Sequence, residues 1–160
     1  MSTCPGCGLK LESYNQNLNE HYNASSACWQ LYCKLSAFTL SLRDSDFIHQ
    51  LIVDTYTAQH SGPNVKPIST AFALIGLYLT FELGYTGKQV QRTHMFLAEK
   101  HIEWPRFDPP IEKNALTVYD VLLSPESQYT DIIGKWGKSV WEMWKREHET
   151  VRKLVEVHTY

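Results

Sequence analysis

Near its N-terminus the chain reads Cys4-Pro5-Gly6-Cys7-Gly8, a Cys-x-x-Cys turn in the form of a zinc knuckle. The tight turn aims two thiolates at one point and lets backbone N–H groups face the sulfurs. Zinc takes four ligands tetrahedrally in structural sites, so two more ligands must come from elsewhere in the chain. The stretch therefore predicts an N-terminal arm organised around one zinc ion.

Cys28 and His21 are the preferred further ligands. Cys28 lies at the start of a predicted helix, where the helix dipole stabilises a thiolate. His21 precedes it by seven residues, in a polar segment flexible enough to fold back. With Cys4 and Cys7 they give the spacing Cys-x2-Cys-x13-His-x6-Cys. This spacing predicts a Cys₃His zinc site.

Cys33 is the competing fourth ligand. Five positions along a helix rotate its side chain by roughly 140° from Cys28, so the two thiols point in different directions. This geometry favours His21 over Cys33. His49 or His60, brought in by tertiary folding, remains an alternative.

Cys4 and Cys7 could instead be a redox pair. Thioredoxin-like motifs need a strand before the Cys-x-x-Cys and a helix directly after it, within an α/β unit. No strand is predicted before Cys4, and no sheet is predicted elsewhere, so zinc is favoured. A closed Cys-rich zinc site is usually structural. We therefore expect the ion to hold the fold and not to perform chemistry.

Apolar residues at helical spacing recur through the rest of the chain. The expected helices span about residues 27–42, 46–60, 69–84, 86–100, 118–123 and 129–157. Ser25 or Ser26, Thr86 and Thr117 are candidate N-caps. The segment 101–110 holds three prolines, which fix φ and remove N–H donors, so it is expected to be a surface loop anchored by Trp104 and Phe107. The predicted fold is all-α: one domain over residues 1–160, with a zinc-binding arm (1–28) packed on a bundle of five to six helices (27–157).

Length and charge limit the class of protein. A chain of 160 residues suits one domain, and a net charge of −2 gives no general field to attract nucleic acid. The longest apolar run, from Ala71 to Phe81, is 11 residues, whereas a membrane crossing needs about 20. The first residues lack a secretory signal, so a cytoplasmic location is expected, where thiols stay reduced.

A second group of chemistry-bearing residues is expected between the predicted helix 46–60 and the final helix. His49 and His60 share a stripe, but they lie roughly 16 Å apart along the axis and cannot bind one metal together. If His148 of the final helix meets either of them near Asp54, the four residues could bind a second metal or act as general acid–base groups. The alternative is a helix-capping His60 and satisfied polar pairs in a Trp-rich core.

Four stretches together resemble a known family. They are Cys4-Pro5-Gly6-Cys7-Gly8, Cys28-Trp29, His49-x-Leu51-x-Val53-Asp54-x-Tyr56-x-x-Gln59-His60-x-Gly62-Pro63, and Trp136-x4-Trp141-x-x-Trp144-x3-His148. The chain is similar to an uncharacterised family of small bacterial proteins, a domain-of-unknown-function family, over nearly its whole length. The resemblance implies a bacterial, cytoplasmic, zinc-binding protein and implies no activity.

Three functions follow from these observations. The first is a small zinc-binding protein whose zinc is structural and whose helical body is an interaction or regulatory module for an unknown protein or small-molecule partner. The second is a metal-assisted, hydrolase-like enzyme with His49, Asp54, His60 and His148 as catalytic residues. The third is a nucleic-acid binder, which is disfavoured because Lys and Arg interleave with Glu along the final helix.

Overall fold

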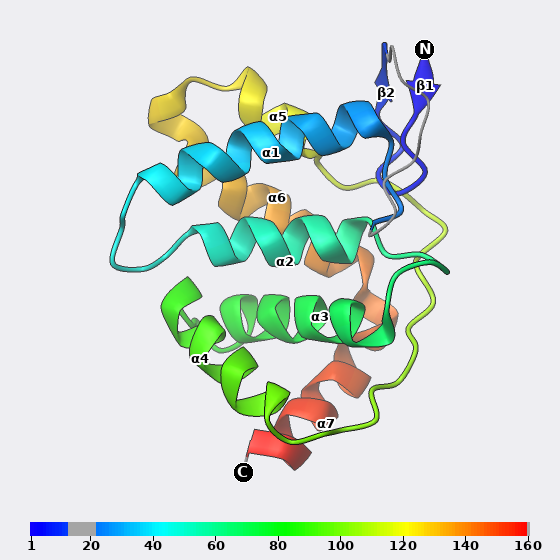
Figure 1. The fold of residues 1–160 in the computed structure, drawn as a ribbon, viewed down its shortest axis with the longest axis vertical. Helices are drawn as coiled ribbons and strands as arrows, with labels where there is room; N and C mark the ends of the chain where they lie inside the picture. The colour runs from blue at the N-terminus through cyan, green and yellow to red at the C-terminus, as the bar shows by residue number, and fades with distance from the viewer. Residues whose placement is uncertain (13–21, 160) are drawn as a thin grey trace.

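The computed structural model describes residues 1–12 and 22–159, and this part of the chain is mostly helical (Figure 1). Its α-helices are α1 (Ser26–Ser41), α2 (His49–Gln59), α3 (Pro67–Phe81), α4 (Gly87–Ala98), α5 (Val118–Leu123), α6 (Tyr129–Met143) and α7 (His148–Thr159). Two 3₁₀ turns, η1 (Glu126–Gln128) and η2 (Lys145–Glu147), flank α6. The prediction of an all-α fold is confirmed.

A two-stranded hairpin at the N-terminus was not predicted. Strands β1 (Ser2–Thr3) and β2 (Lys10–Leu11) pair antiparallel, with Ser2 opposite Leu11. Strands of two residues are too short to show the alternating pattern by which strands are recognised in a sequence. The knuckle turn lies between them, so the hairpin is the frame that holds it.

Helix α2 lies at the centre of the bundle. It packs against α1, α3, α4 and α6, and Figure 1 shows α1, α2 and α3 stacked as three nearly parallel rods. Helices α4 and α7 close the end of the molecule that is farthest from the hairpin (Figure 1). The C-terminal end of α2, at His60, lies against the knuckle turn. The rest of α2 packs against other helices.

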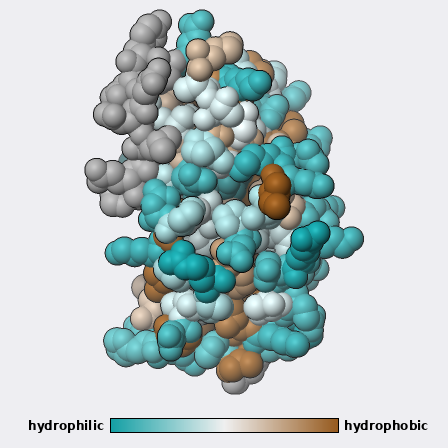
Figure 2. All heavy atoms as spheres, turned by 90° about the vertical axis from the view of Figure 1, so that its right-hand side faces the viewer, coloured by the Kyte–Doolittle hydropathy of each residue, from teal (hydrophilic) through white to brown (hydrophobic). Residues whose placement is uncertain are grey.

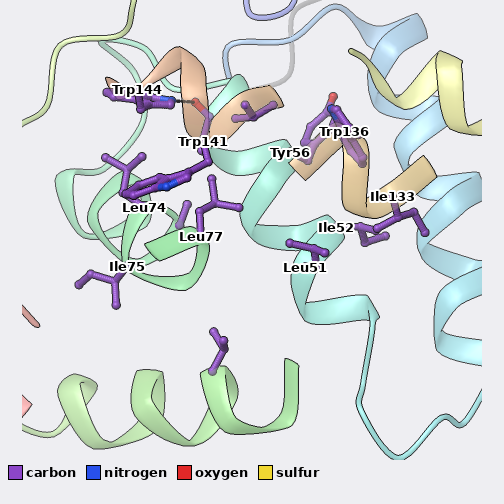
Figure 3. Close-up of a cluster of buried hydrophobic side chains, with 14 of the residues drawn as sticks. Leu51, Ile52, Tyr56, Leu74, Ile75, Leu77, Ile133, Trp136, Trp141 and Trp144 are labelled. Carbon is purple, nitrogen blue, oxygen red and sulfur yellow. Dashed lines mark hydrogen bonds between the residues drawn. The ribbon is translucent and has the colours of Figure 1, made fainter. Parts of the chain in front are cut away.

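The tryptophans of the final segment belong to the core. Trp136, Trp141 and Trp144 are each exposed by 1% or less. Figure 3 shows the three indoles among other buried hydrophobic side chains. Two of their N–H groups are satisfied by α2: Trp136 Nε1 donates to Gln59 Oε1 at 3.0 Å, and Trp144 Nε1 donates to Ala58 O at 3.2 Å. Both acceptors lie at the end of α2. The indoles consequently tie α6 to the same part of α2 that faces the knuckle.

Three helix starts follow the predicted capping chemistry. Ser25 Oγ accepts the N–H of Cys28 at 3.2 Å, which caps α1. Thr86 and Thr117 open α4 and α5 with reciprocal capping boxes. Helix α3 begins at Pro67 and not near Ser69, because proline has the φ that the first helical position needs and lacks only an N–H that would be unpaired there.

The predicted single helix 129–157 is wrong, because the chain bends between α6 and α7. Trp144 leaves the helical conformation with φ −91° and ψ 20°. The ring of His148 stacks on Trp141 at 3.7 Å between ring centroids, and its Nε2 donates to Trp141 O at 2.7 Å. A side chain inserted into the helical hydrogen-bond ladder is a known cause of kinks. The bend lets α7 pack against α3 and α4.

The long connection between α4 and α5 runs over the surface, as its prolines predict. Phe107 is buried, and its ring meets Trp144 edge-on at 6.5 Å between centroids. Trp104 meets Phe72 edge-on at 5.2 Å. These two anchors lead the connection back toward the N-terminal hairpin, where Lys113 reaches the knuckle.

Candidate metal centre

The hairpin turn holds Cys4 and Cys7 on one side. The N–H of Cys4 donates to Leu9 O at 2.8 Å, and the N–H of Gly8 donates to Cys4 O at 2.9 Å. Gly8 has a φ of +79°, in the left-handed region that glycine adopts without steric cost. The turn is thus closed by its own backbone, and both thiols are buried, with 0% and 5% exposure.

Two other elements bring side chains to the same point. The Ser25 cap fixes Cys28 in the first turn of α1, and His60 is the C-cap residue of α2, with φ −112° and ψ 30°. Both are 0% exposed. The ligand atoms of Cys4, Cys7, Cys28 and His60 all lie within 4.8 Å of one another. The hairpin, α1 and α2 therefore meet at one buried Cys₃His cluster.

The distances within the cluster fit a tetrahedral zinc ion. With Zn–S bonds of about 2.3 Å and a Zn–N bond of about 2.0–2.1 Å, a tetrahedron has S···S edges of about 3.8 Å and S···N edges of about 3.6 Å. Cys7 Sγ lies 3.8 Å from Cys28 Sγ, and Cys28 Sγ lies 3.4 Å from His60 Nε2. Three thiolates and one imidazole form a donor set that zinc prefers.

The hydrogen bond on the far side of the imidazole fixes the tautomer of His60. Its Nδ1 lies 2.8 Å from Tyr56 O, which only accepts, so Nδ1 carries a proton and donates. In the neutral ring, Nε2 then presents a lone pair to the three sulfurs. A single S–H can satisfy that lone pair, whereas a metal ion would engage Nε2 and all three sulfurs at once. The arrangement is the one by which proteins orient a metal-binding histidine.

The pKa of the Cys28 thiol is also consistent with a metal-binding cluster. Hydrogen bonds to the sulfurs of Cys4 and Cys7, together with burial, raise the pKa of the Cys28 thiol far above its ordinary value. Three thiols this close cannot all ionise in a dry site by themselves. A divalent cation reverses the balance, because it pairs with each thiolate directly.

Tyr56 and Lys113 lie next to the cluster. Tyr56 stacks on His60 at 3.8 Å between centroids, and its hydroxyl donates to Cys28 Sγ at 3.5 Å. Lys113 Nζ donates to Pro5 O and to Gly6 O, each at 2.7 Å. A zinc ion with three thiolates and a neutral imidazole carries a net charge of −1. The ammonium of Lys113 lies against the knuckle, where it would offset that charge.

The cluster contains the three cysteines that the sequence predicts as ligands, and its fourth member is His60. The structure brings Cys4, Cys7 and Cys28 together, while Cys33 is exposed. His21, the preferred fourth ligand, lies outside the described residues. The sequence predicts His60 as a candidate catalytic residue and offers it as an alternative fourth ligand. It lies 32 positions from Cys28, so only tertiary folding could reveal the contact.

The second predicted group is not brought together in the described residues. His49 Nδ1 lies 2.9 Å from Thr39 Oγ1, whereas His148 binds the carbonyl of Trp141 and His60 faces the cysteines. Among residues 1–12 and 22–159, Cys4, Cys7, Cys28 and His60 are the one set of three or more His, Cys, Asp or Glu side chains close enough to share a metal ion. No second metal-ligand group is present in this part of the chain.

Asp54 belongs instead to a buried polar network. Gln50 Nε2 donates to Asp54 Oδ1 at 3.1 Å and lies 3.5 Å from His94 Nδ1, while His94 Nε2 donates to Phe72 O at 2.8 Å. Asp54 Oδ2 has no hydrogen-bond partner among the described residues. Burial raises the pKa of Asp54 well above its ordinary value, although the hydrogen bond from Gln50 opposes this, so burial favours the neutral form of the carboxyl.

These features define a small helical protein with a buried Cys₃His cluster where its N-terminal hairpin meets α1 and α2. The chain belongs to a family of unknown function (DUF5946), whose sequence model matches residues 2–145. The matched span contains the whole cluster and leaves out α7. This confirms the predicted resemblance to an uncharacterised family. No curated protein and no solved structure matches the chain.

The helices give no sign of a membrane segment. Within residues 1–12 and 22–159, none combines the length and the apolar character that crossing a bilayer requires.

Proposed function

We propose that this protein binds one zinc ion through Cys4, Cys7, Cys28 and His60, and that the ion fastens the N-terminal hairpin to α1 and α2. The observation that carries the proposal is the His60 ring, whose Nδ1 is committed to Tyr56 O and whose Nε2 lies 3.4 Å from Cys28 Sγ. The sulfur–sulfur and sulfur–nitrogen distances are those of a tetrahedral zinc site.

The proposed zinc is structural. Four protein ligands fill a tetrahedron, which leaves no position open for water or substrate. The ligand residues are at most 5% exposed, so a substrate could not reach the ion without local opening. The helical body then serves as an interaction module for a protein or small-molecule partner. A bacterial cytoplasm is the proposed location, because a reducing compartment keeps the thiols available for metal.

The proposal is tested by counting metal in purified protein and its variants. We expect about one zinc per chain in the wild type, loss of that zinc in Cys28→Ser and His60→Ala, and retention in Cys33→Ser. Cys33→Ser is the matched control, because it removes a thiol that is exposed. Each variant is prepared with zinc present, so that a destabilised apo form is not mistaken for a protein without a site.

A companion variant separates the two candidate histidines. His21→Ala should keep its zinc and His60→Ala should lose it. Loss in His21→Ala with retention in His60→Ala would show that the fourth ligand is His21. Retention of zinc in Cys28→Ser would show that Cys28 is not a ligand and would contradict the proposed Cys₃His site.

A further inference from the structure

A cavity of about 330 Å³ opens between α3, α4 and α7, at the end of the molecule far from the hairpin (Figure 1). Leu79 of α3 and Val155 of α7, which are 1% and 2% exposed, form its deepest part. Phe96 of α4 also lines it and is 48% exposed, so this ring lies near the mouth. We call this cavity the α4–α7 pocket. Its lining is mainly apolar, as in most small-molecule sites.

The mouth of the α4–α7 pocket is positively charged. Arg92 and Phe96 lie four residues apart on one stripe of α4, and Lys100 follows beyond the end of the helix, where its Nζ donates to His158 O at 2.6 Å. Lys100 Nζ lies 4.4 Å from the centre of the Phe96 ring. Arg92 lines the pocket, is exposed, and forms no ion pair with a carboxylate of the described residues. None of the lining residues is acidic.

We propose that the α4–α7 pocket binds a small organic anion, namely a carboxylate with a compact alkyl or aromatic body. The apolar base takes the body of the ligand, and the planar guanidinium of Arg92 takes the carboxylate through two parallel hydrogen bonds. Thr93 also lines the pocket, but its hydroxyl donates to Gln89 O at 3.2 Å, so Arg92 is the donor proposed for the carboxylate. The volume lies at the lower end of the range for ligand pockets, roughly 300–1,000 Å³, which suits a compact molecule.

The surroundings favour a small ligand over a macromolecule. The apolar base is recessed behind Phe96, so a ligand must enter the pocket to reach it, and a flat partner surface could not. Figure 2 shows the side of the molecule opposite to α4, on which hydrophilic side chains are interspersed with hydrophobic ones. This site shares no residue with the metal centre. Its test is therefore independent of the zinc proposal.

The test is isothermal titration calorimetry with octanoate and naphthoate, each compared with its neutral amide of the same shape. We expect each carboxylate to bind at least about tenfold more tightly than its amide, which is the usual scale for a charge-assisted hydrogen-bonded pair. Arg92→Gln should abolish that preference and leave amide binding unchanged. Thr93→Trp, which places an indole in the pocket, should weaken both. Arg106→Gln, at an exposed position that does not line the pocket, is the matched control.

Several outcomes would overturn this inference. They are equal affinity for carboxylate and amide, an equal loss in Arg92→Gln and Arg106→Gln, and no binding of any probe at millimolar concentration. Sedimentation of the same samples addresses the competing occupant. A dimer that dissociates in Phe96→Ser would show that a second copy covers this face, and it would also overturn the inference. Circular dichroism and a cooperative thermal unfolding transition of each variant establish that it is folded.

Discussion

At the scale of single residues, Gly6 decides how closely the knuckle turn approaches α2. A Cβ at this position would lie 2.5 Å from Asn23 O and 2.5 Å from His60 Cδ2. We expect Gly6→Ala to lower the free energy of unfolding by roughly 1–3 kcal/mol, the usual cost of overpacking, and to weaken zinc binding. Chemical denaturation of the zinc-bound protein measures the first effect.

Gly134 provides the matched control for Gly6. It lies inside α6, and a Cβ there would meet nothing within 4 Å. Gly134→Ala should stabilise the protein by up to about 1 kcal/mol, because alanine favours the helix. A Gly6→Ala protein as stable as the wild type would show that the turn does not need to lie against His60.

Asp54 gives a residue-scale prediction about pH. Burial raises its pKa in the folded state, so between the unfolded value and this higher folded value the native protein binds more protons than the unfolded chain. Stability must therefore fall as pH rises through that window. Asp54→Asn keeps an acceptor for Gln50 but cannot ionise. We therefore expect its free energy of unfolding to decrease less as pH rises. Above the folded pKa of Asp54, the Asp54→Asn protein should be more stable than the wild type.

The measurement for Asp54 is the free energy of unfolding of wild type and Asp54→Asn from about pH 4, near the unfolded pKa of a carboxyl, upward, with zinc in excess. The difference between the two proteins isolates Asp54 from the metal ligands. Each unit of raised pKa corresponds to about 1.4 kcal/mol of lost stability above the window. Asp108→Asn, an exposed carboxyl, should leave the profile unchanged. Parallel profiles for wild type and Asp54→Asn would refute a buried neutral carboxyl.

At the scale of elements, the bend between α6 and α7 depends on His148. Its Nε2 satisfies the carbonyl of Trp141, a residue that is 1% exposed. In His148→Ala that carbonyl keeps the N–H of Trp144, at 3.1 Å, but loses the histidine donor and the ring stacked on Trp141, so we expect a loss of about 1–2 kcal/mol of stability. Tryptophan fluorescence during urea unfolding measures it. Arg146→Ala, an exposed change in η2, is the control, and an equal effect of the two would contradict the role of His148.

Some features of the helices and of the metal centre could be predicted from the sequence, and others could not. Ser25, Thr86 and Thr117 were recognisable as helix starts because capping is local chemistry between residues three or four apart. The bend at Trp144 was not recognisable, because no proline or glycine marks it and a stacked histidine causes it. The cysteines of the site could be found by their spacing. His60 could not be preferred, because its approach to the knuckle depends on how α1 and α2 pack.

At the scale of the whole molecule, the zinc site and the tryptophan core are adjacent but separable. The proposed ion would hold the hairpin in place, because strands of only two residues each have little stability by themselves. The packing of α2, α3 and α6 rests on buried apolar side chains. We expect a strong chelator to lower the midpoint of thermal unfolding while most of the helical circular dichroism at room temperature remains.

Hydrogen exchange should show the same separation. After chelation, amides of residues 1–12 and of the first turn of α1 should exchange much faster, while those of α3 and α6 should stay protected. Re-addition of zinc should restore protection. Uniform loss of protection across all helices would mean that the ion supports the entire fold, and unchanged exchange in the hairpin would mean that it supports none of it.

The claim that zinc joins the hairpin to the end of α2 is tested most directly by X-ray absorption at the zinc edge, on wild type and on His60→Ala. We expect the wild type to show three sulfur ligands at about 2.3 Å and one nitrogen ligand at about 2.0–2.1 Å, with that imidazole signal lost in His60→Ala. Four sulfur ligands in the wild type, or an imidazole signal that persists in His60→Ala, would contradict this account.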